Sequence, residues 1–221
     1  MIEKVRVSLW DIFTFFMTGL LASLAAAAFA VYAGPMTAME LLSGLAKVPA
    51  SITLVAVPLA FTLFGMLIEP LANYVDRYVF KYALSWATTP RPGARKTEED
   101  LLKQEIRARY LGELGAKVEN PYQLCKDYVE YKQLSTSFMV FLARYGFYRN
   151  CAFISIASGV VAAGQSTTAC GAIVSLIASI LAVIVFRRRA EEFYSYQAPA
   201  IYRAFLIDKI EWKVQDRGGT P

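Results

Sequence analysis

Stretches without charged residues alternate with charged stretches along this chain of 221 residues. The longest charge-free stretch is Asn150–Phe186, 37 residues without Asp, Glu, Lys or Arg. A helix rises about 1.5 Å per residue and crosses a bilayer core in about 20 residues, so this stretch is long enough for two short spans. The polar sequence Gly164–Thr168 supplies the turn between them. We therefore predict a membrane hairpin that ends at the cationic Arg187–Arg189.

Two further charge-free runs precede this hairpin. Ile12–Ala33 contains 22 residues and Val48–Ile68 contains 21. The first run also resembles a secretory signal, but it is longer than the usual apolar region of about 7–15 residues, which favours a membrane anchor. Pro58 lies inside the second run and predicts a bend, because proline removes a backbone hydrogen bond. We treat Pro58 as a candidate hinge, with simple packing as the alternative.

The charged stretches show helical periodicity. A helix is expected to begin near Thr97, where a hydroxyl precedes three acidic residues. Asn120-Pro121 signals another helix start, and the pattern after it suggests one long helix that continues into the third span. Glu69-Pro70 is expected to interrupt the second span, and Pro199 to divide the last helix into two pieces.

These patterns predict an all-α polytopic membrane protein with four transmembrane helices in two hairpins and a helical cytoplasmic region. The first hairpin occupies residues 1–71 and the cytoplasmic region occupies 72–148. The second hairpin occupies 149–187, and C-terminal helices and a tail occupy 188–221.

The distribution of positive charge predicts the orientation. The net charge is +5, and Lys and Arg concentrate at the start, in the region 72–149 and after the second hairpin. Positively charged loops stay in the cytoplasm, so we expect a multi-pass protein of the inner membrane with both termini cytoplasmic. Because the basic residues alternate with acidic ones, the charge does not favour nucleic acid as a partner.

Small residues recur every four positions in three of the predicted spans. Such stripes let helices approach closely in lipid, either within one chain or between the subunits of a homo-oligomer. Serine in these stripes also offers a mild polar lining for a pore, although serine more often bonds its own helix. The candidate helix-packing or pore-lining residues are Gly19, Ser23, Ala27, Ser155, Gly159, Ala163, Gly171, Ser175 and Ser179.

Acidic residues near the membrane lie at the predicted cytoplasmic ends of the spans. Ionisable groups at such positions form structural ion pairs, or a mouth that attracts cations or contacts a substrate. We favour ion pairs, with arginines nearby as partners. The candidate residues are Asp11, Glu69, Asp76, Arg77, Arg144 and Arg149.

No sequence motif for catalysis is recognisable. The chain contains no histidine, which removes the commonest general base and metal ligand. Its three cysteines, Cys125, Cys151 and Cys170, are isolated and form no CxxC pattern. We therefore assign no catalytic residue, metal or cofactor, and an enzyme acting on lipid is the least favoured class.

The segment Arg144–Asn150, the hairpin after it and the later sequence Tyr202–Phe205 resemble the layout of SLATT-type two-span effectors of bacterial defence systems. The resemblance covers roughly the last hundred residues and implies membrane disruption or pore formation after an upstream signal. The additional hairpin at Ile12–Ile68 departs from that layout.

Two functions follow as expectations. The first is an oligomeric membrane protein that forms a pore, or otherwise permeabilises the membrane, under the control of its cytoplasmic helices. The alternative is a non-conducting anchor or accessory subunit that binds a cytoplasmic protein through residues 72–148.

Overall fold

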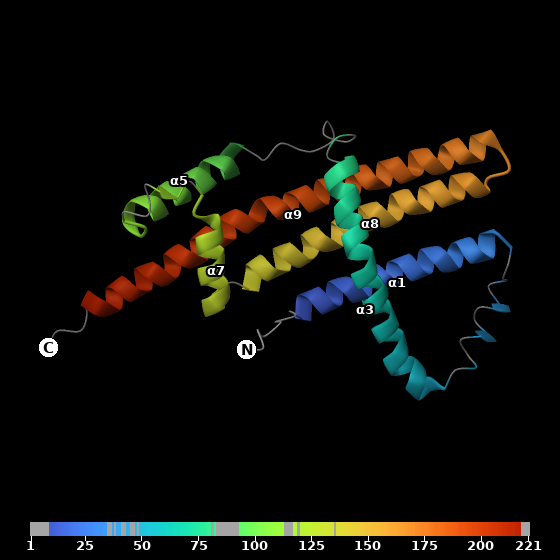
Figure 1. The fold of residues 1–221 in the computed structure, drawn as a ribbon, viewed down its shortest axis with the longest axis horizontal. Helices are drawn as coiled ribbons and strands as arrows, with labels where there is room; N and C mark the ends of the chain where they lie inside the picture. The colour runs from blue at the N-terminus through green and yellow to red at the C-terminus, as the bar shows by residue number, and fades with distance from the viewer. Residues whose placement is uncertain are drawn as a thin grey trace. The chain divides into compact units, whose positions relative to one another are not determined.

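The computed structural model describes most of the chain as helix. It describes residues 9–34, 37, 39–40, 43–44, 47, 49–80, 82, 93–112, 117–118, 120–134 and 136–217, and of residues 9–11, 93–95, 136 and 211–217 only the backbone. The described ranges contain no strand. In chain order (Figure 1), the elements are α1 Leu9–Tyr32, α3 Ala50–Val75, the π-helical turn η1 Asp76–Phe80, α5 Gly93–Arg109, α7 Tyr122–Lys132, α8 Thr136–Gln165 and α9 Ala169–Arg217.

The chain divides into two compact units. Met1–Thr88 and Ala143–Ala190 form one, which we call the membrane unit. Thr89–Leu142 and Glu191–Pro221 form the other, which we call the helical unit. Both α8 and α9 contribute residues to each unit.

Three helical segments in the described chain are long and apolar enough to cross a membrane, whereas four spans were predicted. They are Ile12–Tyr32, Ala50–Phe80 and Ala169–Ile210, and the charge-free part of the third is residues 169–186. The predicted third span lies in α8, where the charge-free residues 150–165 number only 16. At about 1.5 Å per residue they extend about 24 Å, short of a hydrocarbon core of about 30 Å.

The membrane unit exposes most of its apolar side chains. In the most apolar 18-residue stretch of each segment, only 22%, 11% and 11% of the residues are buried inside the protein. Leu54, Leu67 and Leu181 are among the exposed side chains. A water-soluble protein rarely exposes so large an apolar surface, so these faces suit contact with lipid.

Helix α3 lies across α1 within the membrane unit (Figure 1). Their crossing is stabilised by a small apolar cluster of Ala22, Ile68 and Ile154, contributed by α1, α3 and α8. A second cluster joins Phe80 of η1 to Ala152 of α8 and Val183 of α9. These contacts link α1, α3, η1, α8 and α9.

The two expected proline breaks were wrong. Helix α3 continues through Pro70 as far as Val75, and α9 is one helix from Ala169 to Arg217 that includes Pro199. Proline costs a helix one hydrogen bond and causes a local clash, but tertiary packing offsets this cost. Pro199 is itself buried, between Ala198 and Ile201 of the core of the helical unit.

The predicted continuous helix after Asn120 is instead divided. Gln133 adopts a left-handed conformation with φ 58°, and α7 ends at Lys132. The N–H of Leu134 donates to the carbonyl of Val129 at 3.0 Å, the bond that closes a Schellman-type helix end. This turn redirects the chain so that Phe138 of α8 enters the core, where it is 1% exposed.

The helical unit has a core of its own, built by α5, α7 and the parts of α8 and α9 that belong to it. Phe205 of α9 lies between Tyr110 and Tyr128, with ring centroids 6.0 and 5.1 Å away in edge-on geometry. Edge-on contact is the favoured arrangement of aromatic pairs. The other fully buried side chains include Ile106, Cys125, Val129, Ile201 and Tyr202.

Candidate functional site

A layer of polar side chains connects the helices of the membrane unit. Its first ion pair joins Arg149 of α8 to Glu69 of α3, with Nη2 and Oε1 3.2 Å apart. Arg149 also donates from Nη1 to Oδ1 of Asn73 at 3.4 Å, and its guanidinium lies 5.4 Å from the ring centroid of Tyr145. The structure thus places Glu69 and Arg149, both candidates from the sequence, in direct contact.

The second ion pair joins Arg187 of α9 to Asp76, the first residue of η1. Arg187 Nη1 lies 3.3 Å from Asp76 Oδ1, and the arginine side chain is only 9% exposed. Its guanidinium also lies 5.6 Å from the ring of Phe80. Sequence reasoning missed Arg187 as a partner, because it was interpreted only as the cationic end of the hairpin.

Uncharged groups complete this layer. Asn150 is 1% exposed and donates from Nδ2 to Thr18 Oγ1 of α1 at 3.4 Å. Thr14 Oγ1 donates to the carbonyl of Ala143 at 3.4 Å. We call the set of Thr18, Glu69, Asp76, Arg149, Asn150 and Arg187 the polar layer; it links α1, α3, η1, α8 and α9.

The remaining ion-pair candidates lie outside this layer as far as the structure describes them. Arg77 is exposed, with its guanidinium 5.7 Å from the ring of Tyr78. Arg144 is also exposed. Asp11 belongs to α1, but its side chain is outside the described residues.

The crossing of α1 and α3 depends on two glycines that face each other. A Cβ added to Gly19 would overlap the carbonyl oxygen of Phe61, and one added to Gly65 would overlap the carbonyl oxygen of Phe15. The backbones therefore touch, as small residues permit in membrane helices. Gly19 was a candidate from its spacing. Gly65 was missed, although it lies seven residues before the fully buried Ala72. That spacing places both small residues on one face of α3.

Helices α8 and α9 pack through a matching pair of small residues. A Cβ added to Gly159 would overlap the side chain of Ser179. Ser179 Oγ donates to the carbonyl of Ser155 at 2.8 Å, and Ser155 Oγ donates to the carbonyl of Cys151 at 2.8 Å. The two serines are thus engaged in contacts within the chain.

The other small-residue candidates are less tightly placed. Ser23, Ala27 and Ala163 are partly exposed. Ser175 contributes its backbone carbonyl to the surroundings of Gly159. The N–H of Gly171 donates to Thr168 Oγ1 at 3.2 Å, so Thr168 caps the start of α9.

The candidate hinge Pro58 lies inside the continuous helix α3, and its side chain is exposed. Thr62 Oγ1 donates to the carbonyl of Pro58 at 2.8 Å. A hydrogen bond of this kind, from a threonine hydroxyl to the carbonyl four residues earlier, often bends a helix. Whether the helix bends here during function stays a prediction.

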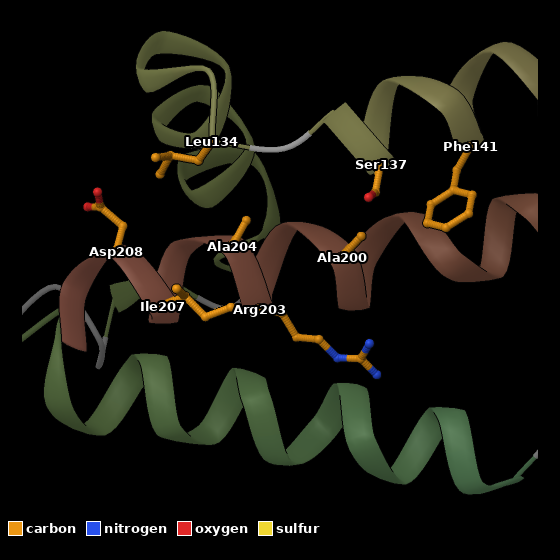
Figure 2. A pocket seen from close by; sticks show the side chains of 8 residues that line it. All are labelled: Leu134, Ser137, Phe141, Ala200, Arg203, Ala204, Ile207 and Asp208. Carbon is orange, nitrogen blue, oxygen red and sulfur yellow. The ribbon is translucent and has the colours of Figure 1, made fainter. Parts of the chain in front are cut away.

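A groove lies on the surface of the helical unit (Figure 2). It has a volume of about 370 Å³ and lies between Leu134, Ser137 and Phe141 on one side and α9 on the other. Ala200, Ala204 and Ile207 form its apolar floor. Charged side chains lie at its edges, where Arg203 pairs with Glu98 and Asp208 accepts from Tyr128 Oη at 2.6 Å.

The polar layer consists of ion pairs and hydrogen bonds between helices. Among the described residues, no three His, Cys, Asp or Glu side chains gather as a metal site. No protein-family model, curated protein or solved structure matches this chain.

Proposed function

We propose that this protein is a non-conducting membrane anchor that holds its helical unit at the membrane to bind a cytoplasmic protein. The observation that carries the proposal is the use of Ser155 and Ser179, candidate pore-lining groups, in hydrogen bonds within the α8–α9 pair. Gly19, Gly65 and Gly159 are likewise occupied by contacts within the chain. What the membrane segments expose is mainly apolar, which suits lipid and not an aqueous pore.

The groove of the helical unit is the proposed contact surface for the partner. Its apolar floor and charged edges have the composition of a protein interface, in which an apolar centre is surrounded by polar groups. Leu134, Ser137 and Phe141 belong to the region 72–148 that the sequence indicated, and α9 adds the remaining side. Ile207 is 58% exposed in this groove, so it is available to a partner.

Two measurements test the anchor. Purified protein in planar bilayers is expected to show no conductance above that of protein-free bilayers. A photo-cross-linking residue at position 207 is expected to give a discrete adduct with one soluble protein in cells, whereas the same residue at the exposed position Leu101 of α5 gives none. Reproducible conductance, or equal cross-linking from both positions, would contradict the proposal.

A pore is the second candidate, and the polar layer is the observation that favours it. Ionisable groups between membrane helices often mark ion pathways, and Oδ1 of the buried Asn150 has no hydrogen-bond partner among the described residues. A pore is also what the resemblance to SLATT-type effectors implies. Conductance that changes ion selectivity when Arg149 is replaced by Glu would establish this function. In either case we propose a homo-oligomer, which the mass of the detergent-solubilised protein tests.

We propose a topology of four crossings in the inner membrane with both termini cytoplasmic. The charge-free part of α8 is too short to be recognised as a membrane span by itself. Its Gly159, however, packs directly on Ser179 of α9. If residues 169–186 cross the bilayer, residues 150–165 accompany them as the second leg of the same hairpin. The ion pairs of the polar layer and local thinning of the bilayer then accommodate its shorter length.

The native cysteines test this orientation. Cys170 is exposed beside the hairpin turn, whereas Cys125 and Cys151 are buried. Burial also raises the pKa of Cys125 to about 11, so its reactive thiolate is scarce at pH 7. A membrane-impermeant maleimide added to intact cells is therefore expected to label Cys170 alone.

A matched variant supplies the control for this labelling. In a Cys170→Ser background, Tyr131→Cys introduces a thiol at a position of the helical unit that is 87% exposed. It is expected to react only after the membrane is permeabilised. Labelling of Tyr131→Cys in intact cells, or protection of Cys170 there, would reverse the proposed orientation.

A further inference from the structure

The helical unit contains a second, smaller pocket that is separate from the groove. It has a volume of about 160 Å³ and lies between α5, the segment before α7, α7 itself and α9. Three tyrosines, Tyr122, Tyr194 and Tyr202, contribute to its lining. Three side chains able to form hydrogen bonds, Glu99, Asn120 and Gln197, contribute as well. A pocket inside a helical core is usually apolar, so this concentration of polar groups calls for an explanation.

Two aromatic rings of the pocket meet at right angles. The rings of Tyr122 and Tyr202 have centroids 6.2 Å apart and an interplanar angle of 86°. Tyr194 adds a third ring that is 46% exposed, and so lies at the open side of the pocket. The face of an aromatic ring attracts cations through its quadrupole, and boxes of several rings recognise alkylammonium groups.

Two buried polar side chains face the same space. Glu99 is 7% exposed, and its Oε1 lies 2.8 Å from Lys103 Nζ, which holds the carboxylate in place. Gln197 is 4% exposed, and its Nε2 has no hydrogen-bond partner among the described residues. Asn120 Oδ1 is already an acceptor, from the N–H of Tyr122 at 3.2 Å and from Tyr202 Oη at 3.4 Å. Because buried donors are normally satisfied, the amide of Gln197 is the group of this pocket that is able to donate a hydrogen bond to a ligand.

The carboxylates near Tyr122 give negative potential at this ring. Burial raises the pKa of Tyr122, and the nearby carboxylates Glu130 and Glu99 raise it further. At Tyr202, burial and then Glu99 raise the pKa, whereas Arg107 lowers it. Lys103 offsets part of the charge of Glu99 without removing the negative potential at this ring. The potential opposes an anionic ligand and favours a cation.

We propose that this pocket binds a small organic cation of the alkylammonium class that also carries an oxygen acceptor. The rings of Tyr122 and Tyr194 contact the cationic group, and the fully buried Tyr202 supports the ring of Tyr122 from behind. Glu99 supplies the compensating charge. The oxygen of the ligand accepts a hydrogen bond from Gln197 Nε2. This site lies apart from the groove and does not depend on whether the membrane unit conducts.

Choline is a suitable probe because a neutral molecule of the same shape exists. The full-length protein is purified in a maltoside detergent, which has no choline headgroup, and titrated calorimetrically with choline or with 3,3-dimethyl-1-butanol. Choline is expected to bind saturably, and the neutral analogue at least about tenfold more weakly. Tetramethylammonium, which lacks the oxygen, is expected to bind more weakly than choline. No saturable binding of choline at tens of millimolar, or equal binding of the neutral analogue, would overturn the proposal and leave only water as the occupant.

Variants assign the binding to this pocket. Tyr194→Leu is expected to weaken choline binding about tenfold, whereas Tyr194→Phe retains the ring and the affinity. Gln197→Leu is expected to abolish the preference for choline over tetramethylammonium. Tyr131→Leu removes an exposed tyrosine outside the pocket and is the matched control. If Tyr194→Leu binds choline as tightly as Tyr131→Leu does, the site lies elsewhere and the assignment fails.

Discussion

Replacing Gly65 with alanine is expected to destabilise the membrane unit by about 2 kcal/mol or more, the range observed when extra methyl groups are forced into tight packing. The added Cβ would meet the backbone of Phe15, not the end of a flexible side chain. Only a separation of α1 from α3 relieves that overlap. Such a separation weakens the contacts of Ala22, Ile68 and Ile154 around the crossing.

The measurement is the melting temperature of the purified protein in detergent, which we expect to fall by roughly 5 °C or more. Gly146→Ala is the matched control, because Gly146 also lies within a helix of the membrane unit but has only the Thr14 methyl group near its Cβ position, at 4.0 Å. Alanine is the better helix former, so the control is expected to be neutral or slightly stabilising. Equal melting temperatures for the two variants would show that α1 and α3 do not cross at Gly65.

Amide hydrogen exchange locates the damage caused by Gly65→Ala. Slower-exchanging amides of α1 and α3 near the crossing are expected to lose protection. The amides of α5 and α7 are expected to keep theirs, because these helices pack in the separate core that contains Ile106 and Val129. Loss of protection in both units would instead indicate that they unfold as one.

The helical character of the chain followed from local patterns that no distant contact overrides. The charge-free runs beginning at Ile12 and Val48 correspond to α1 and α3, because twenty apolar residues favour helix irrespective of their neighbours. The end of α1 also follows from a local signal. Gly34 adopts φ 80°, a conformation that glycine reaches without strain, beside the last turn of that helix.

The errors arose where tertiary packing decides the outcome. Pro70 and Pro199 are strong local breakers, yet the helices continue through them because their neighbours are packed. Gln133 carries no strong signal for a turn, and the core position of Phe138 is what rewards the break there. The pattern of a single sequence does not show which distant residue packs against a given position.

The same limit explains which site residues were found. The spacing of Gly19 and Gly159 indicated close packing, and both make it. The sequence could not tell that their partners belong to the same chain. Asp76 was recognised as a candidate for an ion pair, but Arg187 lies 111 residues further on, and only the fold brings α9 beside η1.

The ion pair between Asp76 and Arg187 is expected to contribute more to stability than the pair between Glu69 and Arg149. The acid decides the difference, since Asp76 is 24% exposed and Glu69 is 41% exposed. Water screens exposed pairs to about 1 kcal/mol or less, whereas removing one partner of a buried pair costs about 3–5 kcal/mol. Because Asp76 is only partly buried, we discount that value and expect a coupling energy of about 1–3 kcal/mol.

Two double-mutant cycles measure this difference. One combines Asp76→Ala with Arg187→Gln, and the other combines Glu69→Ala with Arg149→Gln; thermal or denaturant unfolding in detergent gives each coupling energy. Arg187 also lies against the ring of Phe80. The single variant Arg187→Gln is therefore expected to lose more free energy of unfolding than the coupling energy alone. Equal coupling in both cycles would mean that burial of the acid does not control these pairs. A coupling near zero for Asp76 and Arg187 would mean that the polar layer holds α9 through other contacts.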